Sequence, residues 1–146
     1  MTQRTETALD TLITDTITTN GNNEISGSDV RGILLDMGDS LSFRAVEINT
    51  QTDSYTLVLG DATKYVRMNK GTACNLTVPL NSSVAFPVGT QILIRQVGAG
   101  QVTVVATGGV TITTSQTLLL RAQHSSASLI KVATDTWELA GDLEAA

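Results

Sequence analysis

The sequence predicts a mainly β protein, an antiparallel β-sandwich or barrel preceded by an N-terminal helical arm. Three observations lead to this expectation. From about residue 51 onward, apolar and polar residues alternate in short runs, which is typical of strands that are buried on one face. Turn signals rich in Gly, Asn and Pro separate these runs. Threonine occurs 23 times in the 146 residues, and its β-branched side chain suits a pleated, half-exposed surface.

The composition fits one folded domain with an appendage. A chain of 146 residues leaves little room for two full hydrophobic cores. Charged residues make up 16% of the chain, fewer than the roughly 25% of an average soluble protein. Aromatic residues make up only 3%, so the core must be built mainly from Val, Leu, Ile and Ala.

Residues 1–50 form the predicted arm, and its clearest element is an amphipathic helix. An apolar stripe recurs at positions i, i+3, i+4, i+7 and i+11, which is the spacing of one helix face. The stripe consists of Val30, Ile33, Leu34, Met37 and Leu41. Two glycines inside this helix cost roughly 1 kcal/mol each in helix propensity, so the helix needs a surface to pack on. These five apolar residues are therefore the predicted partner-binding site.

Residues 51–146 form the predicted β-sandwich-like domain. The expected strands are 55–59, 64–69, 75–79, 91–97, 101–106, 110–113, 118–121, 128–132 and 136–139. Their even spacing and short turns favour antiparallel pairing. The turn Gly98-Ala99-Gly100 predicts a β-hairpin between the fourth and fifth of these strands. The strands share no fixed period of the kind that marks a solenoid.

The net charge of −5 is unevenly distributed along the chain. Residues 1–53 carry nine acids and three bases, residues 54–134 one acid and six bases, and residues 135–146 four acids and no base. Acidic ends around a basic middle suit docking between subunits or between arm and body; scattered surface charge is the other interpretation. The bases are widely spaced with no aromatic ladder between them, so no nucleic-acid partner is expected.

The sequence offers no convergent set of catalytic residues. His124 is the single histidine and Ser125 adjoins it, but neighbouring residues on an extended segment point to opposite faces. A glycosidase-type pair of carboxylates would have to join Asp61 to Asp135 or Glu138 across the fold. A small hydrolase would need Asp61, Asp135 or His124 to converge. We therefore expect no enzyme activity, and no catalytic, cofactor-binding or metal site.

Two further classes of partner or processing are not expected. The longest apolar runs have four residues or fewer, which is too short for a membrane-spanning helix, so no membrane partner is predicted. The first ten residues are polar and do not predict a secretory signal.

Cys74 is the single cysteine, which excludes an internal disulfide. We expect it to be a small buried apolar residue.

Six segments of the β-region carry a more specific pattern. They are YTLVLGDA (55–62), KYVRMN (64–69), VPLNSSVAFPVGT (78–90), GAGQVT (98–103), LRAQHSSA (120–127) and WELAGDL (137–143). Together these segments resemble a β-domain of tailed-bacteriophage virion structural proteins, which occurs in head decoration and tail fibre proteins. Residues 25–43 are similar to short segments that precede such domains in fibre proteins.

The resemblance implies a virion protein, made in the cytoplasm of the bacterial host, that forms a homotrimer and has no catalytic activity. Its partners would be further copies of itself and the major capsid protein or other virion proteins. The compact chain favours a capsid decoration (cement) protein or a short fibre module. The alternative is a tail fibre or tail-associated carbohydrate-binding module, in which Trp137, Tyr55 and Tyr65 would stack on sugar rings.

Overall fold

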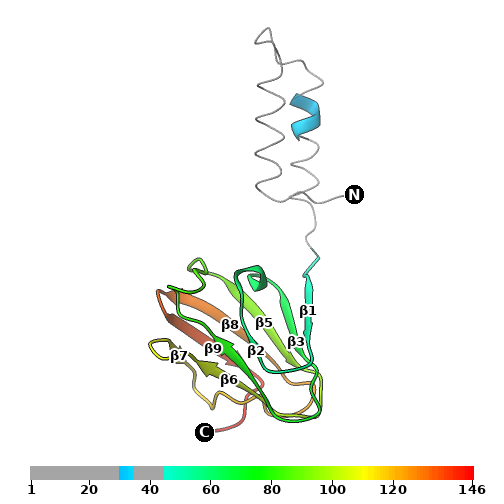
Figure 1. Cartoon of the computed structure of the whole chain (residues 1–146), viewed down its shortest axis with the longest axis vertical. Helices are drawn as coiled ribbons and strands as arrows, with labels where there is room; N and C mark the ends of the chain where they lie inside the picture. The colour runs from blue at the N-terminus through cyan, green and yellow to red at the C-terminus, as the bar shows by residue number, and fades with distance from the viewer. Residues whose placement is uncertain (1–29, 35–44) are drawn as a thin grey trace. The chain divides into compact units, whose positions relative to one another are not determined.

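The computed structural model describes residues 30–34 and 45–146. Residues 30–34 form a helical turn, inside the helix that the sequence predicts, whereas Met37 and Leu41 lie outside the described residues. The strands belong to one compact unit, Val46–Ala146, which Figure 1 shows as two facing layers. For this unit the prediction of a mainly β fold is confirmed.

The described residues contain nine strands and one short 3-10 helix, η1. The strands are β1 (Ile48–Gln51), β2 (Tyr55–Thr56), β3 (Tyr65–Met68), β4 (Cys74–Val78), β5 (Gln91–Gln96), β6 (Val102–Ala106), β7 (Thr111–Thr113), β8 (Ser126–Ala133) and β9 (Thr136–Gly141), and η1 is Leu59–Asp61. A six-stranded sheet has the order β1-β3-β5-β8-β9-β7, and a three-stranded sheet has the order β2-β4-β6. The predicted boundary between arm and β-domain, after residue 50, falls inside β1.

The first six strands alternate between the two sheets and form three stacked coils. Each coil consists of one strand in the larger sheet and the next strand in the smaller sheet, and neighbouring coils pair in parallel. Tyr65 lies opposite Leu93, 28 residues further along the chain. Between the first two coils the shift is shorter, 17 residues from Ile48 to Tyr65 and 21 from Tyr55 to Leu76. This variable spacing explains why the sequence shows no solenoid period.

The predicted antiparallel pairing is wrong for most of the unit. Among the described strands, five pairs are parallel, and the antiparallel ones are β5–β8 and β8–β9. The predicted hairpin around Gly98-Ala99-Gly100 is also wrong, because β5 and β6 lie in different sheets. A short glycine-containing turn reverses the chain in both arrangements. Here the turn leads from one sheet to the other instead of joining two neighbouring strands of one sheet. Alternating polarity along the sequence does not distinguish these two arrangements.

The turns of successive coils lie directly on one another. The backbone N–H of Gly100 donates to the carbonyl oxygen of Lys70 at 3.0 Å. A Cβ atom added at Gly98 would lie 2.0 Å from the carbonyl oxygen of Lys70, and one at Gly100 would lie 2.0 Å from that of Thr72. Glycine is therefore required at both positions by the close approach of two backbones.

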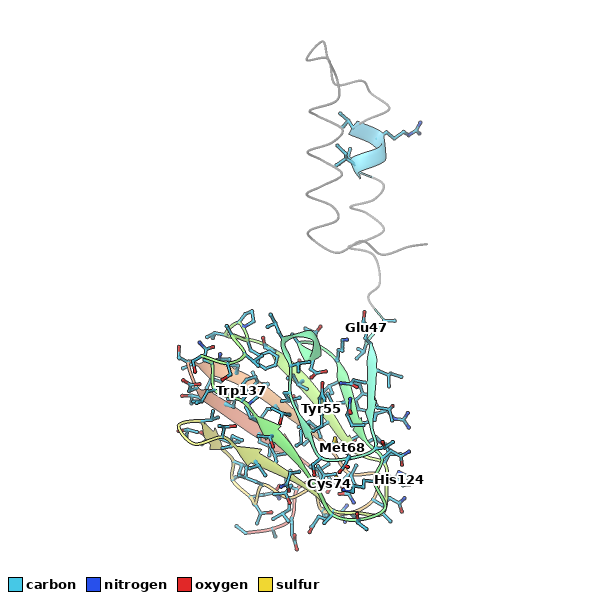
Figure 2. The ribbon with its side chains drawn as sticks, viewed as in Figure 1. Glu47, Tyr55, Met68, Cys74, His124 and Trp137 are labelled. Carbon is cyan, nitrogen blue, oxygen red and sulfur yellow. The ribbon has the colours of Figure 1, made fainter. Side chains whose placement is uncertain are left out.

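The space between the sheets is filled mainly by aliphatic side chains, as the composition predicts. The buried apolar residues are Leu57, Val66, Met68, Cys74, Leu76, Val78, Phe86, Ile92, Ile94, Val102, Val104, Leu120, Ala127, Leu129, Trp137, Leu139 and Leu143. Residues 118–121, a predicted strand, extend the smaller sheet through isolated bridges of Leu119 to Thr103 and of Leu120 to Leu143. Figure 2 shows Met68 and Cys74 among these interior side chains.

The first coil closes one end of the core with polar groups. The carboxylate of Asp61, which is 1% exposed, accepts hydrogen bonds from Asn49 Nδ2 at 2.7 Å, from the Tyr55 hydroxyl at 2.9 Å and from the Val58 backbone N–H at 2.9 Å. Burial, and then the hydrogen bond to Asp61, raise the pKa of Tyr55 above its ordinary value. These bonds tie the polar groups of the first coil together inside the unit.

Replacing Gly100 by Ala should destabilise the unit, because the new methyl group would overlap the backbone of Thr72. We expect the free energy of unfolding to fall by about 3 kcal/mol. Gly71 lies in the preceding turn with nothing within 4 Å of an added Cβ, so Gly71→Ala is the matched control and should change stability by less than about 0.5 kcal/mol. Denaturant unfolding measures both, and equal losses would contradict the stacked turns.

Candidate partner-binding face

Three of the five predicted partner-binding residues lie within the described helical turn. Val30 and Leu34 are 44% and 60% exposed, and Ile33 is half-buried. Met37 and Leu41 lie outside the described residues. The turn thus presents two large apolar side chains to solvent, as a docking helix would.

The outer face of the six-stranded sheet is a second apolar surface. Alternation along each strand buries Ile92, Ile94 and Leu129 inside the unit and points their neighbours outward. The exposed large apolar residues on these strands and in the segment that leads into β1 are Val46, Ile48, Leu93, Ile130 and Val132. We call this surface, formed by the outward residues of β1, β3, β5, β8 and β9, the outer face.

A hollow of about 300 Å³ lies in the outer face. It is lined almost entirely by apolar atoms, from Val46, Tyr65, Leu93, Ile94, Ser126 and Ala127. Its lining residues come from β3, β5 and β8 and from the segment before β1. Small side chains on β8 therefore leave a depression beside larger side chains on β3 and β5.

Charged side chains of opposite sign lie on different strands of the outer face. Arg67 on β3 and Arg95 on β5 lie side by side in register, and Arg95 Nη1 donates to Ser126 Oγ at 3.3 Å. Glu138 on β9 lies opposite Ile130 on β8 and is exposed. The face thus carries basic side chains on β3 and β5 and an acidic one on β9, with Leu93, Ser128 and Ile130 between Arg95 and Glu138.

A buried lysine holds the long connection between β4 and β5. Lys131, on β8, is 2% exposed. Its Nζ donates to Asn81 Oδ1 at 2.5 Å and to the carbonyl oxygen of Phe86 at 2.7 Å, and lies 5.9 Å from the centroid of the Trp137 ring. The backbone N–H of Asn81 donates to Asp135 Oδ1 at 2.6 Å. Buried charges need such partners, and here they fix the path of the connection.

The residues around the single histidine form a structural cluster. His124 is exposed, has a φ of 72° and lies at the lower right of the β-unit in Figure 2. Ser125 is buried and its hydroxyl donates to Asp142 Oδ2 at 2.7 Å. Arg121 donates to both oxygens of the same carboxylate, at 2.6 and 3.0 Å. The Arg121 hydrogen bond, and next that of Ser125, lower the pKa of Asp142.

The other candidate residues from the sequence lie in separate places. Asp61 lies in the first coil and Asp135 binds the backbone of Asn81, while Glu138 is on the outer face. Cys74 is buried, and that burial raises the pKa of its thiol. Within residues 30–34 and 45–146, no group of three or more His, Cys, Asp or Glu side chains is placed to hold a metal ion.

Two of the three aromatic residues considered for sugar stacking are engaged inside the unit. Trp137 is 1% exposed and packs edge-to-face on Phe86 with ring centroids 5.5 Å apart. The hydroxyl of Tyr55 is bound to Asp61. Tyr65 is half-buried on the outer face. The expectation that Trp137 offers a stacking platform is therefore wrong, because this large side chain fills the core between β9 and the β4–β5 connection.

Comparison with known proteins adds no family assignment. No protein-family model matches the chain, and no curated protein matches its sequence. The likeness to phage virion proteins is thus an expectation from the sequence segments quoted above. No helix in the described part of the chain is long and apolar enough to cross a membrane.

The outer face was not predicted, although the sequence contains a signal for it. The runs Ile92-Leu93-Ile94 and Leu129-Ile130 are apolar at consecutive positions. Consecutive apolar residues in a strand indicate that both faces of the strand are apolar. In a unit of two sheets one of these faces points away from the core and is available to a partner.

Replacing Lys131 by Met should remove the buried donor for Asn81 and Phe86. We expect the free energy of unfolding to fall by about 2 kcal/mol, because a buried carbonyl oxygen loses its hydrogen bond. Lys64→Met is the control, since Lys64 pairs with Glu47 at the surface and should affect stability much less. Equal effects of the two changes in denaturant unfolding would contradict a specific role of Lys131.

Replacing Asp142 by Asn should change how stability depends on acid pH. The pKa of Asp142 lies below its ordinary value of 3.8, so its contribution is present above that value and is lost as the pH falls through the folded pKa. The wild type should be more stable than Asp142→Asn at neutral pH, and the difference should shrink on acidification. Thermal unfolding over a pH series measures it; a difference independent of pH would contradict this assignment.

Proposed function

We propose that this chain is a non-enzymatic structural protein of a tailed-bacteriophage particle, a capsid decoration protein or short fibre module. It acts by associating with copies of itself and by docking on the major capsid protein or other particle proteins. The observation that carries the proposal is the outer face, a continuous sheet surface with five exposed large apolar residues. The sequence resemblance supplies the kind of particle and the expected homotrimer.

The use of buried charge supports a structural role. The buried charged residues of the described unit are Asp61 and Lys131. Asp61 binds the first coil together through Asn49, Tyr55 and Val58, and Lys131 binds the connection between β4 and β5. Both side chains direct their polar atoms at structural partners, which suits a unit whose role is to keep its shape.

The exposed helical turn supports docking by the N-terminal region. Val30 and Leu34 lie one helical turn apart and are both exposed, so they form adjacent contacts on one helix face. A groove on a partner recognises a helix through such apolar residues at i and i+4. We assign particle docking to this helix face and presentation of the outer face to the β-unit.

Localisation tests the proposal directly. Antibodies against the chain should label particles at regular positions in electron micrographs of a lysate from the cells that produce it. The chain should also co-sediment with those particles. Chain found solely in the soluble fraction, with no labelled particles, would contradict the proposed function.

A double variant, Val30→Asp with Leu34→Asp, should prevent docking, because two charges would have to be buried at the helix contact. We expect at least a tenfold loss of co-sedimentation with particles, with unchanged thermal unfolding of the β-unit. Val88→Asp is the matched control, since Val88 is 64% exposed on the β-unit. Equal losses for the helix variant and the control would contradict docking through the helix.

A further inference from the structure

We infer that the outer face is the contact between two copies of this chain, and that Arg95 of one copy meets Glu138 of the other. The inference deepens the proposed function, on which its biological meaning rests, by naming the partner of this face as a second copy. This two-fold contact joins copies in pairs, so it is distinct from the contacts that would hold the expected homotrimer together. The contact itself can be tested on the isolated protein.

The positions of three outward residues carry the inference. Strands β5, β8 and β9 are neighbours in the sheet. On β5 and β8, Leu93 lies opposite Ser128 and Arg95 opposite Ser126, and on β8 and β9, Ile130 lies opposite Glu138. Ser128 is therefore the midpoint of a diagonal whose ends are Arg95 and Glu138. A two-fold axis that lies between the two faces, above this midpoint and perpendicular to the diagonal, brings each end of the diagonal over the opposite end on the second copy.

The shape of the face fits the same partner. Along one register row, Tyr65 and Leu93 are followed by the small residues Ser128 and Ala140. The larger side chains form a ridge beside the apolar hollow of about 300 Å³. Packed sheet faces gain contact area when side chains of one face enter depressions in the other, and this face offers both a ridge and a hollow.

The charges of the face are also self-complementary. Within residues 45–146, no ion pair engages Arg67, Arg95 or Glu138. The basic residues lie on β3 and β5 and the acidic residue on β9, so a second copy supplies an opposite charge for each side of the face. Two arginines beside apolar residues form too small a basic surface for a nucleic-acid backbone, which is bound by many phosphate contacts.

The size of the face is adequate for self-association. The five strands of the face, each about 4.8 Å wide and about five residues long, cover roughly 24 by 17 Å. With side-chain relief, the accessible area approaches the roughly 800 Å² per partner that a standard interface buries. A face of this size needs its exposed apolar residues and its charge pairs together to hold two copies.

Charge reversal tests the contact on the full chain. Arg95→Glu and Glu138→Arg should each lower self-association at least tenfold, because each places like charges together. The double variant Arg95→Glu/Glu138→Arg should regain association, and so should an equimolar mixture of the two single variants, in which opposite charges meet again. Sedimentation velocity over a concentration series measures association of the wild type, the two single variants, the double variant and the mixture. A further variant, Leu93→Ser, should weaken association without changing the charge.

Asn75→Glu and Asn75→Arg are the controls, since Asn75 is exposed on the smaller sheet, and both should associate like the wild type. A monomeric wild type would overturn the inference. Association that persists in both single variants, or that neither the double variant nor the mixture restores, would also overturn it. If the charge variants do not fold, judged by circular dichroism, unchanged association of Leu93→Ser would overturn it. Particle labelling is independent of these outcomes, so a failed contact and a failed proposed function can be told apart.

Discussion

Parallel stacking of the three coils is the constraint on which the rest of the β-unit depends. Each coil contributes inward side chains to the space between the sheets, and its backbone hydrogen bonds are made with the next coil. The coils can approach closely only where the turns carry no side chain, which is why Gly98 and Gly100 lie against the backbone of the preceding turn. The sheets, their spacing and their outward surfaces all follow from this stacking.

A stack of coils must end, and the two ends are closed by different chemistry. At the first coil, polar side chains gathered around Asp61 occupy the interior position that an apolar residue holds elsewhere. After the third coil, β8 pairs with β5 in the antiparallel direction and β9 follows it, so the parallel order cannot continue. The buried Lys131 then ties the β4–β5 connection to this closing pair. The result is a unit of defined size.

The closed unit leaves one broad sheet surface to interact with others. Strands β5 and β8 are apolar on the inside, through Ile94 and Leu129, and partly apolar on the outside, through Leu93 and Ile130. The inner residues hold the unit together, whereas the outer ones, Leu93 and Ile130, are each 37% exposed after folding. Their exposure is explained if a second copy covers them, and the helix face with Val30 and Leu34 would serve a different partner in the same way. Folding and assembly would thus use opposite faces of the same strands.

The sequence by itself determined the β class, the aliphatic core and the approximate place of most strands, because alternating polarity and turn residues act over a few neighbouring positions. It also contained the consecutive apolar residues around Leu93 and Ile130 that mark a strand with two apolar faces. Only the tertiary structure decided that the turn with Gly98 and Gly100 arches between sheets and that β1, β3 and β5 pair in parallel. It likewise decided that Trp137 fills the core and that Arg95, Ser128 and Glu138 share one diagonal. The reason is physical: local patterns specify which side of a strand is buried, whereas the identity of its neighbour depends on contacts between residues far apart in the chain.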